Sequence, residues 1–451
     1  MGRVIGPPAA GSLLANPYPL AAKRCIGFGS GPKTPNVPIF LQSSELRFSN
    51  HREAPRRAAE PRSGSCRSNF SIPIMGKVNY KKMKGSQNLR QRLLLSTLSG
   101  TPILVEDIRA DDKFPGLRPH EISLLRLFDR VTDDCVVEIN DTGTKFKYKP
   151  GVVMGGRRVA HDCGVSRAIG YFLEPLIVLG LFGKKPLEIR LKGITNDSKD
   201  PCVDTFRSTT LPILKRFGVP SEGLDLKIES RGVPPLGGGE VVLSVPIVQA
   251  LSAVTWIDEG MVKRIRGWTF SAKVSSQFEI QMIHAARGIF NNLLPDVHIF
   301  TDHKAGLQAG NSPGYGISLV AETNAGCCIS ADTTISYARG DDVGDMEDEK
   351  KELKPPQDVG EDMASALLEE IELGGVVDSS HQGLLFLLCA LCPPDISKVR
   401  VGKLMPYGVE TLRQIKDFLG VEFNIKMDTT TKTVILKCMG CGLKNLSRKS
   451  S

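Results

Sequence analysis

The feature that most constrains the fold is a segment that occurs twice. TLPILKRFGV, beginning at Thr210, resembles TLRQIKDFLGV, beginning at Thr411, with Thr, Leu, Lys and Phe matched at a constant offset of 201 residues. Each copy is followed by an alternating strand, a turn and a second strand, LDLKIES with VVLSVPI and VEFNIKM with TVILKCM. The apolar stripe from Leu124 to Val131 predicts a helix, and the hairpin after it makes a third, weaker copy. Repeated helix–strand–strand units predict an α/β sandwich with one helical layer per sheet.

One block interrupts the repeats between about Asp258 and Tyr337. It combines a strand (WTFSAKV), a helix from Phe278 to Leu294 and the strands VHIFTD and GISLVAET, which is typical of a small inserted α/β domain. Upstream, a further helix is predicted from about Cys163. We therefore assign 75–257 to the first repeats, 258–337 to the insert, and 338–451 to an acidic connection and the last repeat.

The connection begins with an acidic stretch. Residues 338–362 hold ten Asp and Glu against four Lys and Arg. We interpret the stretch as a solvated flexible loop.

Residues 1–74 differ from the rest of the chain. They contain ten prolines, ten Lys and Arg, and no aspartate. That composition is typical of a disordered leader or an organelle transit peptide. A third interpretation, which we prefer, is that Met75 is the natural start.

Charge and apolar content limit the classes of partner. The formal net charge is +9, but the first 74 residues carry +7 of it, so bulk charge alone does not indicate a nucleic-acid ligand. The longest apolar run, Leu384 to Cys392, is too short to cross a bilayer, and we expect no membrane partner.

Two CxxC pairs, Cys389/Cys392 and Cys438/Cys441, raise the question of a zinc site. The first lies in the apolar run LLFLLCALCPP and the second ends an apolar strand. Zinc knuckles usually lie in polar, Gly-rich turns, so we predict core thiols and no metal site.

The segment RGVPPLGGGE predicts a loop with little side-chain bulk. Gly237, Gly238 and Gly239 could bring backbone N–H groups close to a phosphate, with Arg231 as its charged partner. Tight connections between strands use the same residues, which leaves a structural interpretation open.

Four long motifs resemble one family. GSQNLRQRLLLSTLSGTP, IRADDKFPGLRPHE, LKGITNDSKDPCVD and RGVPPLGGGEVV are similar to those of the RNA 3′-terminal phosphate cyclase-like proteins, and the resemblance extends from about Met75 to the C terminus. It implies the cyclase-like fold, with repeated α/β units and a small inserted domain.

The nucleophile of true cyclases is missing from this pattern. They carry a nucleotide on a histidine within His-x-x-Asp-Gln, whereas this chain has VVDSSHQGLLFLL. Anchored on Gln382, the nucleophile position is Asp378, and His381 stands one residue before the glutamine, out of register. A carboxylate cannot replace imidazole in forming a phosphoramidate, because that bond needs a neutral nitrogen.

Two further positions depart from the cyclase pattern. Arg90 is retained in MKGSQNLR, but the glutamate position holds Met83 and an arginine position holds Asp112. The resemblance therefore implies a pseudo-enzyme with no catalytic residue and no cofactor. Arg90, Arg231 and the three glycines remain as candidates for binding phosphate or RNA.

The resemblance implies a place in ribosome biogenesis. The non-cyclising branch acts in the nucleolus, in early pre-rRNA cleavages toward 18S rRNA, with a ribosome-assembly GTPase and components of the small-subunit processome. The alternative is an RNA-processing enzyme, either a pre-rRNA endonuclease or a residual cyclase. Asp302, His303 and Lys304 could form a nuclease cluster, but neighbouring strand residues point to opposite faces, which favours a surface strand end.

Overall fold

The computed structural model describes residues 46–48, 79–156, 158–336 and 353–445. Within them, three units share the element order strand, helix, strand, helix, strand, strand. The first unit comprises β2 (Lys81–Lys84), α1 (Leu89–Ser99), β3 (Ile103–Glu106), α2 (Pro119–Val131), β5 (Val136–Ile139) and β6 (Phe146–Lys149). The second comprises β8 (Arg158–Asp162), α3 (Ile169–Leu181), β9 (Leu187–Gly193), a helix made of α4 (Val203–Thr205), η1 (Phe206–Thr210) and α5 (Leu211–Arg216), then β10 (Asp225–Ser230) and β11 (Gly239–Val245). The third comprises β12 (Thr255–Trp256), α8 (Gln382–Leu391), β17 (Ile396–Val401), α9 (Pro406–Leu419), β18 (Phe423–Asp428) and β19 (Thr433–Met439).

The three sheets also share one topology. Their strand orders are β5-β6-β3-β2, β10-β11-β9-β8 and β18-β19-β17-β12. In each sheet the first two strands of the unit are parallel and the other pairings are antiparallel. The α/β fold predicted from the repeated segments is confirmed, including the weaker first copy.

Three short strands lie outside this pattern. They are β1 (Leu46–Phe48), β4 (Thr132–Asp133) and β7 (Val152–Val153). Strand β4 pairs with β7, and β1 pairs with the edge of β5. Strand β1 falls inside the predicted leader of residues 1–74, where we expected no strand. The rest of that prediction lies outside the described residues.

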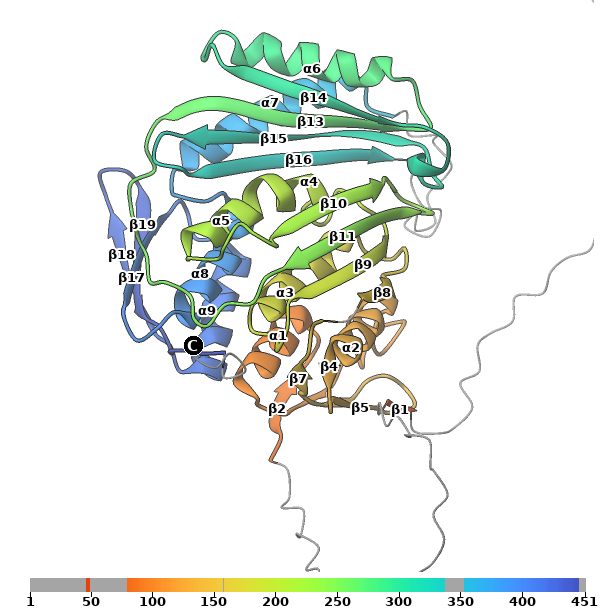
Figure 1. The fold of residues 1–451 in the computed structure, drawn as a ribbon, viewed down its shortest axis with the longest axis vertical. Coiled ribbons are helices and arrows are strands. Elements are labelled where there is room, and N and C mark those ends of the chain that lie inside the picture. Colours follow the sequence, from red (N-terminus) through yellow and green to blue (C-terminus); the bar gives the residue numbers. More distant parts are fainter. Residues whose placement is uncertain (1–45, 49–78, 157, 337–352, 446–451) are drawn as a thin grey trace, which may run out of the picture. The chain divides into compact units, whose positions relative to one another are not determined.

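The helices of the three units pack together between the sheets. Helix α1 contacts α3 and α9, and α9 contacts α8 (Figure 1). One continuous apolar core runs through all three units and includes the apolar run predicted at Leu384–Cys392, which forms α8. No helix in the described ranges is long and apolar enough to cross a membrane.

Helix α3 begins later than its pattern suggested. We predicted a start near Cys163, but the helix begins at Ile169. Ala168 is extended and forms a parallel bridge to Ile194, so its backbone belongs to the sheet and cannot extend the helix.

The insert joins β12 to the remainder of the third unit. It comprises β13 (Val262–Ala272), α6 (Gln277–Phe290), β14 (Val297–Lys304), η2 (Gly306–Ala309), β15 (Gly314–Thr323), β16 (Cys328–Ser336) and α7 (Pro356–Leu373). Its sheet order, β14-β13-β15-β16, differs from that of the units, and α6 and α7 cover one face (Figure 1). The insert has its own apolar core, which agrees with a separate module.

Helix α7 corrects our interpretation of the acidic stretch. The part described, from Leu353, includes the first turns of a helix, whereas we predicted a loop over 338–362. Val359, Ala364 and Leu367 are buried in the core of the insert, so this apolar stripe outweighs the acidic composition. The insert as packed therefore continues past Tyr337 to α7; the remaining domain boundaries stay predictions.

Candidate functional site

A cavity of about 430 Å³ lies where the three units meet. Its wall includes Arg90 of α1, Tyr171 of α3 and Tyr407 of α9, so each unit contributes a side chain. We call it the central cavity.

Arg90 is held in the central cavity by groups of the protein itself. Its guanidinium pairs with Glu174 at 2.7 Å and donates to the Tyr407 hydroxyl at 3.1 Å and the Tyr171 carbonyl at 3.3 Å. It also lies 5.1 Å from the centre of the Tyr171 ring. Burial lowers the pKa of Arg90, but Glu174 and the two tyrosines raise it further, so the side chain stays charged.

The other two arginines of the central cavity are paired in the same way. Arg109 makes a two-pronged contact with Glu121, at 2.8 and 2.7 Å. Arg167 donates from Nε to Asp200 at 2.7 Å. Each of the three arginines thus faces a carboxylate of the chain, and a phosphate would have to compete with it.

His120 is neutral at the mouth of this arginine cluster. Burial lowers its pKa to about 4, helped by the charges of Arg167 and Arg109. The ring packs edge-on against Tyr171, with centroids 5.3 Å apart. A general base works best with a pKa near the operating pH, so His120 is poorly suited to that role.

Among the described residues that line the cavity, Gln91 is the one whose buried side-chain polar atoms lack hydrogen-bond partners. It is 1% exposed, and neither its Oε1 nor its Nε2 makes a hydrogen bond there. Leaving such an amide unsatisfied costs about 1–3 kcal/mol per group. Both atoms are covered by protein, so a ligand in the central cavity could reach them only if neighbouring side chains moved.

Asp378 lines a second recess of about 370 Å³, which shares Lys199, Asp200 and Ser380 with the central cavity. Its carboxylate accepts hydrogen bonds from Ser330 N and Oγ, at 3.0 and 2.7 Å, and from Ser380 Oγ at 2.6 Å. It also caps the turn η3 (Ser379–His381). Burial raises the pKa of Asp378, but His381 and these donors outweigh burial and hold it well below its ordinary value. At the position where we predicted the lost nucleophile, the chain thus has a structural carboxylate.

His381 has no free nitrogen to offer. Its Nδ1 bonds Asp378 at 2.8 Å and its Nε2 bonds the Thr210 hydroxyl at 2.9 Å, while the residue is 5% exposed. Burial lowers the pKa of His381, but Asp378 raises it by more. Both nitrogens are occupied, so the ring cannot stand in for the histidine of the cyclase pattern.

Met83 and Asp112 lie away from the central cavity. Met83 is in β2, with its side chain against the apolar core. Asp112 is about half exposed and lies 3.5 Å from Arg118. Neither residue lines the central cavity, whose acidic and basic side chains come from other positions.

Arg231 lies in a different place from Arg90. It is fully buried, and its five N–H donors bond Asp204, Asp302 and Asn196. Its guanidinium also lies 5.1 Å from the centre of the Phe270 ring. Arg231 therefore ties the second unit to the insert, and binding a phosphate would require displacing two carboxylates.

The glycines beside Arg231 allow two loops to touch. Gly237 and Gly238 have positive φ, and the Gly237 carbonyl accepts from the Asn311 N–H at 2.8 Å. A Cβ on Gly239 would lie 2.5 Å from Thr195. Close packing accounts for these glycines, and their predicted contact with phosphate stays a prediction.

Asp302 and Lys304 pair with each other, but His303 does not join them. Asp302 bonds Arg231 and Lys304, the latter at 3.1 Å, whereas His303 bonds Ser271 on β13 at 2.7 Å. The strand-end interpretation accounts for all three.

Three of the four CxxC cysteines are buried in the main core: Cys389, Cys392 and Cys438. Burial raises the pKa of Cys392 to about 12. Cys441 is exposed, so the prediction of core thiols fails for this residue.

Sequence reasoning missed most of the central cavity. Of its arginines only Arg90 was predicted, although Asp200 stands in one of the quoted motifs, LKGITNDSKDPCVD. Glu174 and Tyr407 come from distant helices and carry no local signal. The partner set of Arg90 could be found only once the units were packed together.

Comparison with known proteins identifies the family to which the chain belongs. Residues 81–425 match the profile of the family described as RNA 3′-terminal phosphate cyclase. A probable RNA 3′-terminal phosphate cyclase-like protein of Arabidopsis thaliana is 69% identical over 374 residues, 83% of this chain and 100% of the relative. The RNA 3′-terminal phosphate cyclase-like protein of Homo sapiens is 45% identical over 370 residues, 81% of this chain and 96% of the relative.

A further relative carries a name that refers to a process. The protein of Schizosaccharomyces pombe named rRNA processing protein rcl1 is 41% identical over 373 residues, 82% of this chain and 98% of the relative.

Proposed function

The chain belongs to the RNA 3′-terminal phosphate cyclase family, and we propose that it is an rRNA-processing factor of ribosome biogenesis without cyclase activity. The proposed role in rRNA processing rests on the name of the fission yeast relative, which is similar to this chain over nearly its whole length. The proposed absence of cyclase activity rests on residues of this chain itself.

The observation that carries the proposal is the environment of Asp378. A nucleotidyl carrier needs a neutral nitrogen that can reach the α-phosphate. At that position the chain has a buried carboxylate whose oxygens already accept from Ser330, Ser380 and His381. The other ring nitrogen of His381, Nε2, is hydrogen-bonded to the Thr210 hydroxyl.

The central cavity supports binding better than catalysis. Its arginines are held by Glu174, Glu121 and Asp200, so they shape the pocket without an open positive charge. Such a site suits a small polar group or a nucleotide edge, and of the residues proposed for RNA binding Arg90 is the one that lies in it.

We further propose the finer assignment that the family resemblance implies. The protein would act in the nucleolus within the small-subunit processome, in early pre-rRNA cleavages toward 18S rRNA, together with a ribosome-assembly GTPase. Arg231 is not part of this proposal, because its donors hold the insert in place.

Labelled ATP or GTP tests the absence of cyclase chemistry. Purified protein is incubated with nucleotide, Mg²⁺ and an RNA bearing a 3′-phosphate, beside an authentic cyclase as the positive control. We expect no labelled band in denaturing electrophoresis and no cyclic end. A band that survives base but not acid would identify a phosphoramidate and refute the proposal.

Depletion tests the process independently. Cells lacking the protein should accumulate uncleaved small-subunit precursors while large-subunit rRNA is unchanged, and wild-type protein should restore cleavage. Normal precursor ratios after depletion would separate the chain from rRNA processing, whatever the nucleotide assay gives. RNA cleavage by purified protein, lost with Arg90→Ala, would favour the endonuclease alternative.

A further inference from the structure

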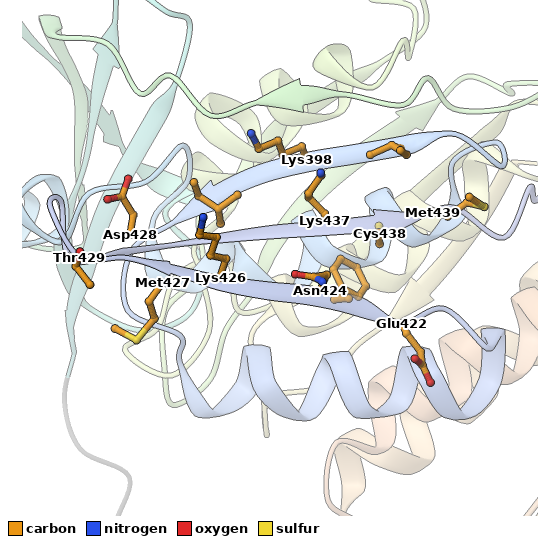
Figure 2. Close-up of a pocket in the computed structure, with 13 residues that line it drawn as sticks. Lys398, Glu422, Asn424, Lys426, Met427, Asp428, Thr429, Lys437, Cys438 and Met439 are labelled. Carbon is orange, nitrogen blue, oxygen red and sulfur yellow. The ribbon is translucent and has the colours of Figure 1, made fainter.

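The third sheet has a basic outer face, on the side opposite α8 and α9. We use this name for the side that carries Ile396, Lys398, Asn424, Lys426, Ile435, Lys437 and Met439. Figure 2 shows Lys398, Lys426 and Lys437 pointing to this side and Met427 to the other. These residues line a groove of about 950 Å³.

The lysines of this face oppose one another. In the register of β17 and β19, Lys398 pairs directly with Lys437, and Lys437 pairs with Asn424 on β18. None of the three lysines makes an ion pair with a described residue. The acids of the groove are engaged elsewhere, Asp428 with Arg400 at 3.1 Å and Glu422 with Lys416 at 2.9 Å. Like charges directly opposite one another destabilise a sheet.

The other sheets compensate their outward charges. In the first sheet Lys147 pairs with Glu138 at 2.9 Å, and in the second Arg190 pairs with Glu240. Among the described strands of the three sheets, directly opposed lysines therefore occur in the third sheet, whereas Lys147 is opposite Glu138 in the first and Lys192 is opposite Glu240 in the second.

Strand β18 is an edge of this sheet among the described strands, so one side of its backbone lacks a neighbouring strand. Its inward side chains Ile425 and Met427 are 49% and 66% exposed. They line a second groove of about 860 Å³, with Leu373 and Leu404. An open edge with lysines on one side and apolar groups on the other matches a strand whose side chains alternate between acidic and apolar.

We propose that β18 binds an extended, alternating acidic and apolar segment of a protein partner as a fifth strand of this sheet. Its backbone would pair with β18, and alternate side chains would lie on the two sides. The acidic ones would face Lys426 and Lys437, and the apolar ones would cover Ile425 and Met427. This interface goes beyond the proposed role in rRNA processing and does not depend on it.

Two other occupants fit this edge less well. Single-stranded RNA is usually bound by stacking on exposed aromatic rings. Of the 13 side chains that line the groove, the one aromatic ring is Phe423, which packs on Phe386 with centroids 5.9 Å apart. A second copy pairing through its own β18 would bring a second set of lysines to the same face, which repulsion disfavours.

The test uses a labelled peptide, acetyl-VELDVELDV-amide, and the full chain, with affinity measured by fluorescence polarisation. The double variant Lys426→Glu/Lys437→Glu should bind on the order of tenfold more weakly or worse, because it reverses the charge of the lysine next to the added strand and of the lysine one strand further in. Its matched control is Lys184→Glu/Lys215→Glu, which makes the same charge change at exposed lysines outside both grooves. We expect the control to bind like the wild type.

Two further measurements separate strand addition from simple charge attraction. Methylating alternate backbone nitrogens of the peptide should abolish binding, since it removes donors to β18. Ile425→Ser/Met427→Ser should weaken binding while the melting temperature is retained, because both side chains are exposed.

Four results would overturn the proposal. They are equal binding of acetyl-VKLKVKLKV-amide, no effect of backbone methylation, absence of peptide binding alongside tight binding of a ten-nucleotide oligouridine, and a concentration-dependent dimer that Ile425→Ser/Met427→Ser abolishes. The third would assign the face to RNA, and the fourth to a second copy.

Discussion

The central cavity and the basic outer face of the third sheet both gather basic side chains, but only the central cavity supplies them with carboxylates. Arg90, Arg109 and Arg167 each meet an acid of the chain, whereas Lys398 and Lys437 meet each other. The acids of the cavity occupy its arginines, whereas the opposed lysines of the outer face make no ion pair with a described residue. On the functions proposed above, a cavity without cyclase chemistry and a surface that binds a partner would differ in this electrostatic respect.

The largest effect is expected where a paired charge is fully buried. Arg231→Met leaves Asp204 buried at 2% exposure without its main partner, and should lower the free energy of unfolding by about 3–5 kcal/mol. Denaturant titration measures it, with the exposed Lys437→Met as the control, which should change stability by about 0.5 kcal/mol or less. Equal costs for the two variants would contradict a bridging role for Arg231.

Asp378→Ala should have the next largest effect. It removes the cap of the turn before α8 and the partner of buried His381, at a cost of about 2–4 kcal/mol. Asp417→Ala, on the exposed side of α9, is the matched control and should be nearly neutral. Asp378→His should gain no nucleotide adduct. Adduct formation by that variant would show that the chemistry was lost at this one position.

The Asp378–His381 pair should also shape stability against pH. The pKa of Asp378 is lowered, so its contribution is present above the unfolded value near 3.8 and lost as pH falls toward its folded pKa. The pKa of His381 is raised, so its contribution is complete below the unfolded value near 6.5 and lost as pH rises through its folded pKa. The pair should therefore stabilise most between those two values. Denaturant midpoints of wild type and His381→Gln should differ by a constant amount between these two values and converge as pH rises through the folded pKa of His381. A difference that stays constant at higher pH would refute the coupling.

The smallest predicted effects are those of two charge reversals, one that stabilises the third sheet and one that destabilises the second. Lys437→Glu places a carboxylate opposite Lys398 and should stabilise by about 0.2–1 kcal/mol, provided that no partner is bound. Glu240→Lys, on the second sheet, places a cation beside Arg190 and should destabilise by a similar amount. Midpoints of thermal unfolding at low salt measure both. Destabilisation by Lys437→Glu would mean that the lysines of the outer face are already compensated.

The repeated units could be predicted because their pattern is local. In β9 the residues alternate strictly between buried and exposed, as LEIRLKG indicates, and the copies at Thr210 and Thr411 both lie in helices followed by hairpins. Helix α7 escaped prediction because its acids masked a buried stripe through Val359, Ala364 and Leu367. The predicted loss of the nucleophile rests on the register of Asp378 and stays a prediction.

The partners of the site residues could not be predicted, because pairing is decided by packing. Arg90 and Tyr407 are 317 positions apart, and Arg231 and Asp302 are 71 apart. From sequence, both arginines are equal candidates for phosphate. Burial and the acids around them distinguish an arginine in a cavity from one that joins two modules.

The position of the insert has a consequence for the order of folding during synthesis. In the second unit, the parallel strands β8 and β9 pair residues about 30 positions apart. In the third unit, the insert separates the parallel strands β12 and β17 in the sequence, and Arg400 donates to the Ile257 carbonyl from 143 positions away. Closing the longer loop through an unfolded insert costs roughly 1.4 kcal/mol more, since each doubling of length adds about 0.6. A folded insert removes most of that difference, because the Gly375 N–H donates to Glu259 and brings its two ends together. We therefore expect the third unit to close last on the ribosome, after the insert. Pulse-labelled hydrogen exchange should show α6 protected before β17.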